Sequence, residues 1–210
     1  MLDTQTCLMP ATHRSATRAF ASASDFPSQA QAEDAVRTLL AWAGDDPSRP
    51  GLRDTPARVV RAYNDWFSGY RQNAKDILAR TFDEVAGYTD IVSLQDIPIE
   101  SHCEHHLAAI RGVAHIAYIP DRRVVGISKL ARLADAFSKR LQIQERMTAE
   151  IGKTLQEALE PKGVAVVIKA THDCMSSRGV HKHGSALVTR YFSGAFEDTV
   201  AQDRFLQTVR

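Results

Sequence analysis

The sequence predicts an α+β fold in which helices cover one face of a four-stranded antiparallel sheet. Four segments are rich in β-branched or alternating apolar residues, which is typical of strands: 91–100, 112–120, 163–170 and 186–192. Between the second and third segments, two stretches ending near Leu141 and Leu159 repeat apolar residues with helical spacing. The order is therefore strand, strand, helix, helix, strand, strand. Because such a sheet leaves two open edges, strand pairing between subunits is one expected solution.

Shorter signals complete this core. Residues 124–127 are expected to extend or bend the second strand, and Ser128 to cap the helix that follows it. Pro161 and Gly163 end the second helix. From Asp198 onward the pattern predicts a short C-terminal helix.

Helices are also predicted before the first strand. Apolar residues from Ala32 to Ala43 follow one helical face, and Gly44 is a typical stop. Thr55 and Pro56 predict the N-cap and first residue of a second helix. Its expected buried stripe consists of Val59, Tyr63, Trp66, Phe67 and Tyr70. A third short helical stretch covers 76–82.

The N-terminal residues 1–28 are rich in Ala, Ser and Thr without apolar periodicity, which predicts a disordered or loosely docked tail. Arg14 and Arg18 resemble a transit peptide, but Asp3, Asp25 and the missing amphipathic face count against one. We therefore expect a tail, 1–28, and a single domain, 29–210. Within that domain we separate N-terminal helices, 29–85, from a catalytic part, 86–210.

The composition is that of an ordinary globular protein, with 44% hydrophobic and 24% charged residues among 210. A formal net charge of +1 gives no global attraction to nucleic acid or membranes, so any anion must be bound locally. No apolar run approaches the roughly 20 residues of a membrane span. Three cysteines do not make a disulfide framework, which favours a cytoplasmic location.

A candidate metal site is divided between two distant segments. Cys103 and His106 lie three residues apart in S-H-C-E-H-H, and Cys174 lies in H-D-C-M. Three protein ligands with a fourth position open are typical of catalytic zinc, whereas structural zinc sites usually have four. Nearby are further groups able to transfer protons: His102, Glu104, His105 and His172.

Blander interpretations of these residues exist. Either cysteine could be a packed core residue, or the two could form a disulfide. However, four of the eight histidines lie within a few residues of Cys103 and Cys174, and such clustering is improbable as packing. Cys7 lies in the tail and is left out. Since Cys and His suit several divalent metals, the residues leave zinc and iron both open.

Four motifs occur together and in order: C-E-H-H, G-I-S-K-L-A-R, Q-I-Q-E-R-M-T and H-D-C-M-S-S-R-G-V-H-K. Through them the sequence closely resembles the GTP cyclohydrolase I family, from about Gly51 to Phe196. The resemblance implies the tunnelling fold, or T-fold, in which the sheets of several subunits join into a barrel. It also implies a homodecamer of two stacked pentamers. The implied reaction is hydrolysis of GTP at C8 of guanine, with formate release and ring closure to 7,8-dihydroneopterin triphosphate, the first step of tetrahydrofolate and pterin biosynthesis.

The resemblance also implies roles for individual residues. Cys103, His106 and Cys174 match the zinc ligands, and His105 and His172 match the proton-transfer histidines. Glu145, with Gln144 beside it, matches the carboxylate that anchors guanine. The family's positions around the triphosphate match Ser128, Lys129, Arg132 and Arg178. Its basic positions that a neighbouring subunit supplies match Arg58 and Arg61. On the sequence alone, the charged residues among these would more often be solvated.

The chain departs from the family pattern at two places. Ala108 or Ala109 stands where a proline is frequent, and Leu187 where a hydroxyl residue is common. Both departures put local loop geometry in doubt rather than the chemistry.

The chemistry agrees with the resemblance. C8 of a purine is a poor electrophile, so the reaction needs hydroxide near neutral pH, which zinc supplies by lowering the pKa of bound water to about 7.

Two other classes of function remain as alternatives. A zinc nucleobase deaminase carries H-x-E followed by P-C-x-x-C, and this chain has H-C-E but lacks the second cysteine pair. A non-catalytic pterin or purine binder of the same fold would use zinc for structure. A free fourth coordination position beside His105 and His172 distinguishes the enzyme from that binder.

Overall fold

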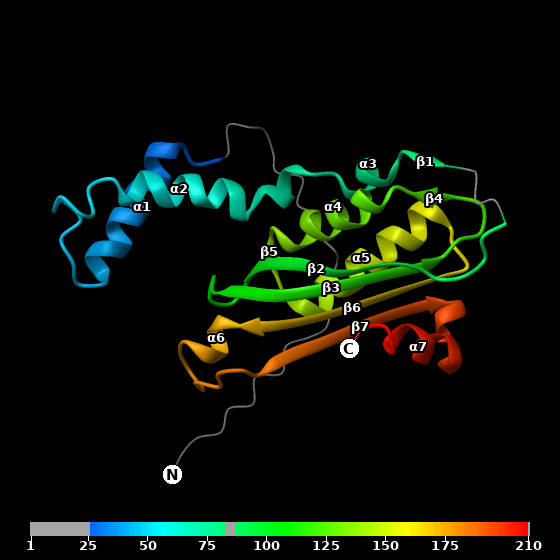
Figure 1. The fold of residues 1–210 in the computed structure, drawn as a ribbon. Coiled ribbons are helices and arrows are strands. Elements are labelled where there is room, and N and C mark those ends of the chain that lie inside the picture. Colours follow the sequence, from blue (N-terminus) through cyan, green and yellow to red (C-terminus); the bar gives the residue numbers. More distant parts are fainter. Residues whose placement is uncertain (1–25, 83–86, 210) are drawn as a thin grey trace, which may run out of the picture. The chain divides into compact units, whose positions relative to one another are not determined.

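The computed structural model describes residues 26–82 and 87–209 (Figure 1). The chain divides into two compact units, Met1–Val60 and Arg61–Arg210, and the second contains the sheets. The predicted tail lies outside the described residues as far as position 25, and so does Cys7. The division at 85/86 between N-terminal helices and catalytic part stays a prediction.

In the first unit, α1 (Gln29–Trp42) confirms the predicted helix. Ser28 and Gln31 form a capping box, which supplies partners to backbone N–H groups that the helix start leaves free. Gly44 follows the helix at φ +97°, a conformation that glycine adopts without steric cost. No residue of α1 is buried, and Trp42 is 88% exposed. Among the described residues, the apolar face predicted from the sequence is therefore half-buried or exposed rather than buried.

Helix α2 (Thr55–Trp66) begins where the sequence predicts, but its predicted buried stripe is wrong. Only Pro56 is buried in α2, while Trp66 is 43% and Tyr70 57% exposed. After α2 the chain turns through a 3-10 helix, η2 (Ser68–Arg71). Gly69 allows η2 to approach the backbone of residues 136–139 closely, because its N–H donates to Lys139 O at 3.0 Å and a Cβ would lie 2.5 Å from Ala136 O.

The predicted antiparallel sheet is confirmed. Its strands are β2 (Val92–Cys103), β3 (Ala109–Ile119), β6 (Gly163–His172) and β7 (Ala186–Gly194), paired in that order. A two-residue strand, β5 (Leu141–Gln142), adds a fifth member by pairing in parallel with the end of β2. Strand β2 carries a bulge between Leu94 and Ile97, where Asp96 has φ +53°.

Three local predictions are corrected. Residues 124–127 do not extend the second strand, because β4 (Val124–Val125) pairs with β1 (Thr81–Phe82) in a separate two-stranded sheet. Helix α3 (Ala74–Leu78) is correspondingly shorter than the predicted 76–82 stretch at its C-terminal end. Helix α4 (Ile127–Ser138) has Gly126 at its N-cap without a side-chain bond, so Ser128 lies in the first turn and is not the cap.

Two apolar layers cover opposite faces of the sheet. Along β6, Val164, Val166 and Ile168 face the main core with α4 and α5 (Gln144–Leu159), as predicted. The alternate residues Ala165 and Val167 pack in a second, smaller cluster. That cluster includes Phe196 of η3 (Ala195–Glu197) and Phe205 of α7 (Thr199–Leu206). Figure 1 shows α7 on the side of the sheet away from α4 and α5.

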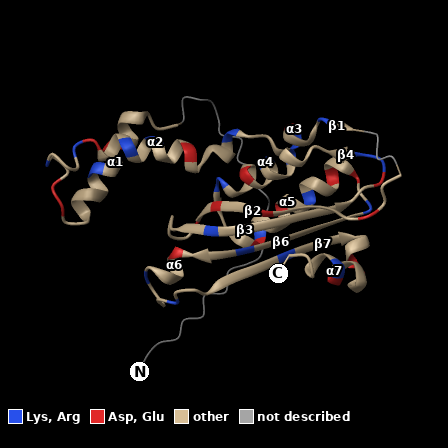
Figure 2. Cartoon of the chain, in the orientation of Figure 1, with Lys and Arg blue, Asp and Glu red and all other residues tan. Residues whose placement is uncertain are grey.

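None of the described helices has the length and apolar character needed to cross a bilayer. Figure 2 shows both signs of charge distributed over the described elements.

Candidate metal centre and surrounding site

The two halves of the metal motif meet at one end of the sheet. Strand β2 ends at Cys103, and β6 ends at His172, after which the short helix α6 (Asp173–Ser176) carries Cys174. The start of β3 lies between them, because Ala109 pairs with His102 and Ile110 pairs with His172. This placement at neighbouring strand ends is the one that the sequence predicts.

A tight turn presents the first half-motif. Cys103 N–H donates to Ala108 O at 2.8 Å, and Leu107 N–H donates to Cys103 O at 2.9 Å. Leu107 adopts φ +56°, a left-handed conformation that is rare for a residue other than glycine. Since backbone bonds close the turn, the missing proline at Ala108 or Ala109 does not prevent it from forming.

Candidate ligand atoms of Cys103, His106 and Cys174 all lie within 4.8 Å of one another. Zinc–sulfur distances of about 2.3 Å and zinc–nitrogen distances of about 2.0 Å place tetrahedral ligands roughly 3.5 to 3.8 Å apart. Small side-chain adjustments would therefore bring the three atoms to a shared ion. Both cysteines are free thiols, so the alternative of a disulfide between them is not adopted.

The contacts within the cluster indicate the protonation of two of its members. Arg178 Nη1 lies 3.1 Å from His106 Nε2, and because a guanidinium can only donate, this nitrogen is an unprotonated acceptor. A metal would need the same lone pair of His106 and would therefore replace the Arg178 contact. Burial raises the pKa of the Cys174 thiol, and the neighbouring Cys103 raises it further. A bound cation would relieve this by favouring thiolates.

The two predicted proton-transfer histidines lie beside the cluster. His105 Nδ1 lies 3.6 Å from Cys103 Sγ. His172 Nε2 lies 2.9 Å from Gln144 Oε1. Burial lowers the pKa of His172, and the negative charge of Glu145 opposes this effect. Glu145 is exposed in the first turn of α5, near enough for its charge to act on His172.

His102 has a different environment from the other histidines. Its ring centroid lies 5.0 Å from that of Trp66 and 5.2 Å from that of Phe67, and its buried Nδ1 has no hydrogen-bond partner. Burial lowers the pKa of His102, and the positive charge of Arg111 lowers it further. Its inclusion among the proton-transfer groups is therefore corrected, since this side chain packs under two aromatic rings.

An ion-paired network behind the turn was missed by sequence reasoning. Arg146 Nη2 lies 2.6 Å from Glu104, and Arg146 Nε donates to Gln142 Oε1 at 3.1 Å. Glu104 N–H also donates to Gln142 O at 3.1 Å. The network ties the first turn of α5 to the metal-binding turn. The proximity of Arg146 to Glu145 in Q-E-R was the available signal, but it does not reveal a partner 42 positions earlier.

The basic residues predicted around the triphosphate do not gather in one place within this chain. Arg178 contacts His106, as described. Ser128 and Lys129 follow β4, whose Val125 N–H donates to the hydroxyl of Tyr118. Tyr118 lies nine residues along β3 from Ala109, or about 30 Å at roughly 3.3 Å per residue. The start of α4 is thus at the opposite end of the sheet from the metal cluster, and Arg132 lies one turn further along α4.

The remaining predicted basic residues lie on α2. Arg58 lies 3.6 Å from Asp54, one turn earlier, and both are well exposed. Arg61 is exposed as well. Their solvation leaves both side chains accessible to another molecule.

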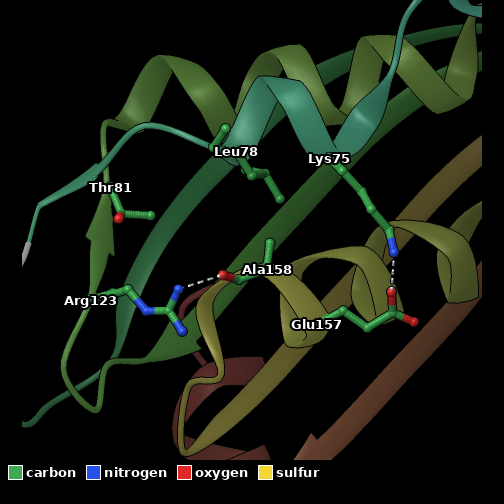
Figure 3. Close-up of a pocket in the computed structure, with 7 residues that line it drawn as sticks. Lys75, Leu78, Thr81, Arg123, Glu157 and Ala158 are labelled. Atoms are coloured by element: carbon green, nitrogen blue, oxygen red, sulfur yellow. Dashed lines mark hydrogen bonds and ion pairs between the residues drawn. The ribbon is translucent and has the colours of Figure 1, made fainter.

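A separate pocket is lined by charged and apolar residues of α3, α5 and the β4 segment (Figure 3). Lys75 is ion-paired there with Glu157 at 3.1 Å, and Arg123 donates to Ala158 O at 3.4 Å. None of the residues predicted for the site lines this pocket. Because its Lys75 is already ion-paired and its Arg123 already hydrogen-bonded, this pocket is not a candidate binding site for the triphosphate.

Together these features define an α+β protein in which Cys103, His106 and Cys174 form a group that could hold a metal ion at one end of an antiparallel sheet, flanked by histidines. The profile of GTP cyclohydrolase I matches residues 32–210. The chain belongs to the GTP cyclohydrolase I family.

Curated relatives agree with this assignment. GTP cyclohydrolase 1 of Maricaulis maris is 54% identical over 200 residues, which cover 95% of this chain and 98% of that protein. GTP cyclohydrolase 1 of Sinorhizobium fredii is 54% identical over 88% of this chain and 90% of that protein. Among solved structures, the archaeosine synthase QueF-Like in the apo form aligns with a TM-score of 0.42 and 20% identity, over 50% of this chain and 94% of that one. That likeness is too remote to bear on function.

Proposed function

We propose that this chain is a GTP cyclohydrolase I that opens guanine at C8, releases formate and forms 7,8-dihydroneopterin triphosphate. The observation that carries the proposal is the meeting of Cys103, His106 and Cys174 within 4.8 Å, with His105 and His172 beside them. Three ligands leave a coordination position for water or substrate, which a purely structural zinc site does not need. The nucleobase deaminase alternative lacks its second cysteine pair and is set aside.

The donor set fits zinc, since two thiols and an imidazole are ligands that zinc prefers. Bound there, zinc would supply hydroxide near neutral pH by lowering the pKa of water to about 7. His105 and His172 are the groups that would move protons to and from the ring nitrogens of the purine. An imidazole suits this role because its pKa is close to neutral pH.

Recognition of the base is assigned to Glu145. Guanine presents N1–H and its 2-amino group side by side, and one ionised carboxylate can accept from both. Adenine offers no donor at N1 and only hydrogen at C2, so ATP would leave the carboxylate facing a lone pair. Sites built on such hydrogen bonds reject analogues that lack them by about 10⁴-fold.

Binding of the triphosphate is assigned to basic residues from more than one subunit. Arg178 is supplied beside the metal cluster. Ser128, Lys129 and Arg132 are at or toward the far end of the sheet, so we infer that a neighbouring subunit brings its α4 to this site. Arg58 and Arg61 would also come from a neighbour.

Assembly into a homodecamer is consistent with exposed features of the single chain. Strand β7 is an edge strand with Leu187 and Val188 about two-fifths exposed, and an unpaired edge of this kind favours pairing with another copy. Leu39 and Trp42 of α1 are 64% and 88% exposed, so this helix offers a second apolar surface that another copy could cover. We place the protein in the cytoplasm, because its free thiols suit a reducing compartment.

The experiment is incubation of purified protein with GTP, following formate and the near-ultraviolet absorbance of a dihydropterin, together with metal analysis. Product formation with about one zinc per chain is the expected result. Tight GTP binding without formate would instead favour the non-catalytic binder. If the protein contains iron and turns over GTP fully, the assignment of zinc is wrong but the assignment of the reaction stands.

Sharing of the site is tested by mixing. Lys129→Ala and Cys174→Ser chains, each nearly inactive alone, are unfolded together and reassembled. Restored turnover is expected, because some sites then combine an intact Lys129 with an intact Cys174. A mixture that stays inactive while reassembling fully would refute a shared site.

A further inference from the structure

Gln144 stands out because its side chain is polar, 1% exposed and fully engaged within the protein. Its amide Nε2 lies 3.1 Å from Ile168 O, 3.1 Å from Leu187 O and 3.0 Å from Thr189 Oγ1. Its Oε1 lies 2.9 Å from His172 Nε2. No atom of this amide is left over to read a guanine, which was the role expected from the sequence.

The orientation of the amide is determined by its partners. Backbone carbonyls can only accept, so the NH₂ group must face Ile168 and Leu187, and Oε1 must face His172. The hydroxyls agree with this assignment. Thr148 donates to Gln144 O at 2.7 Å, so the 2.6 Å contact between Thr148 and Thr189 uses the Thr189 proton. Thr189 Oγ1 can then accept as well, sharing one of the two Nε2 hydrogens with a backbone carbonyl.

The tautomer of His172 follows from the same hydrogen-bond partners. An amide oxygen can only accept, so the proton of neutral His172 must be on Nε2. The lone pair is then on Nδ1, which forms no hydrogen bond with another of the described residues. His172 thus presents an acceptor, rather than a donor, to whatever occupies the site.

We propose that Gln144 is a positioning residue that fixes the ring of His172 in the Nε2–H tautomer and leaves Nδ1 free to accept a proton from the substrate. The proposal rests on the proposed function for the identity of that substrate. The tautomer itself does not depend on it. Leu187 takes part through its backbone carbonyl, which explains why a residue without a hydroxyl is accepted at this position.

Replacing the amide should separate catalysis from binding. In Gln144→Met the chain length is kept, but the Nε2–H of His172 loses its acceptor and the ring can rotate or change tautomer. We expect kcat for GTP to fall about 10-fold to 100-fold, the range typical of lost support to a functional histidine. KM and zinc content should change little, because Glu145 and the metal ligands are untouched.

The matched control is Gln156→Met. Gln156 is in the same helix, donates to Pro161 O at 3.2 Å and accepts from Ser193 Oγ at 2.9 Å, at the other end of α5. The Gln156→Met substitution removes comparable hydrogen bonds and leaves those of His172 unchanged. Its kcat should remain within about twofold of wild type once stability is matched.

The decisive measurement is solid-state ¹⁵N spectroscopy of histidine-labelled protein at mildly alkaline pH, with His172→Ala to assign the signal. The wild-type protein should give a protonated Nε2 and an unprotonated Nδ1 for His172. This arm requires neither turnover nor a folded Gln144 variant. A wild-type Nδ1–H tautomer would overturn the proposal, as would a Gln144→Met protein in which KM rises while kcat is unchanged. Absence of GTP turnover by wild type would refute the proposed function and leave the tautomer assignment standing.

Discussion

Gly112 offers a sharp test of how closely the strands approach beside the site. It lies in β3 and pairs with Ala170 of β6, two positions from the Ile110–His172 pair. A Cβ built on Gly112 would lie 2.1 Å from Lys169 O and 2.5 Å from Ala170 Cα. Both obstacles are backbone atoms of the central sheet, so no side-chain rotation can relieve the contact. We therefore expect Gly112→Ala to be strongly destabilising.

The magnitude follows from the displacement that is needed. Reaching an ordinary contact of 3.4 Å from 2.1 Å requires the strands to separate locally by more than 1 Å. Overpacking costs about 1–3 kcal/mol, and each weakened ladder hydrogen bond costs about 1 kcal/mol. Replacing glycine by alanine also stabilises the folded protein by about 0.4–1 kcal/mol, because alanine lowers the conformational entropy of the unfolded chain. With one such bond weakened, the net loss should be about 1–4 kcal/mol, a large part of a typical total of 5–15 kcal/mol.

The assay is urea unfolding at matched protein concentration, with GTP turnover measured well below the transition. Gly126→Ala is the control, because no atom lies within 4 Å of its Cβ position and its φ is −59°. Gly112→Ala should unfold at lower urea and turn over more slowly per folded chain, since the shift reaches His172. A Gly112→Ala protein within about 0.5 kcal/mol of wild type would refute the reasoning.

Three further outcomes are expected. Cys174→Ser should lose metal and turnover while far-ultraviolet circular dichroism stays near wild type, and stoichiometric zinc in this variant would exclude Cys174 as a ligand. Glu145→Gln should lower kcat/KM for GTP by about 10²-fold or more at unchanged zinc content, because a donor then faces the donors of guanine; equal efficiency would mean that another group reads the base. Burial lowers the pKa of His115 below its ordinary 6.5, and its Nδ1 accepts from Asp96 N–H at 3.2 Å. The unfolded chain therefore binds the His115 proton more tightly than the folded chain, so the free energy of unfolding should fall as pH drops below 6.5. His115→Gln should lose less stability than wild type between about pH 7.5 and 5.5. An equal pH dependence of the two proteins would contradict this.

The strands and the metal cluster were predictable because their signals are local. Runs of β-branched or alternating apolar residues mark β2, β3, β6 and β7, and the two half-motifs follow directly from the ends of β2 and β6. The stripe of α2 was misread because an apolar face indicates burial without saying by which chain. Trp66 and Tyr70 remain exposed in this chain, as does α1. Sequence periodicity cannot distinguish a core from a subunit contact.

Roles that depend on hydrogen-bond partners could not be read from spacing. Gln144 and Glu145 are adjacent, yet one is buried against β6 and β7 while the other is exposed. Their difference arises from helical geometry, since adjacent residues point about 100° apart. The Glu104–Arg146 pair likewise joins segments 42 positions apart, and only the sheet brings them together.

The proposed sharing of the site between subunits, which is inferred from the distance of about 30 Å along β3 between the start of α4 and the metal cluster, has a genetic consequence. Suppose that a cell makes equal amounts of wild-type chain and of a chain defective at both Lys129 and Cys174. With random assembly, a shared site is intact only when both of its contributors are wild type, which leaves about one site in four rather than one in two. A single defective allele would therefore lower flux below half, and such alleles should behave as partly dominant.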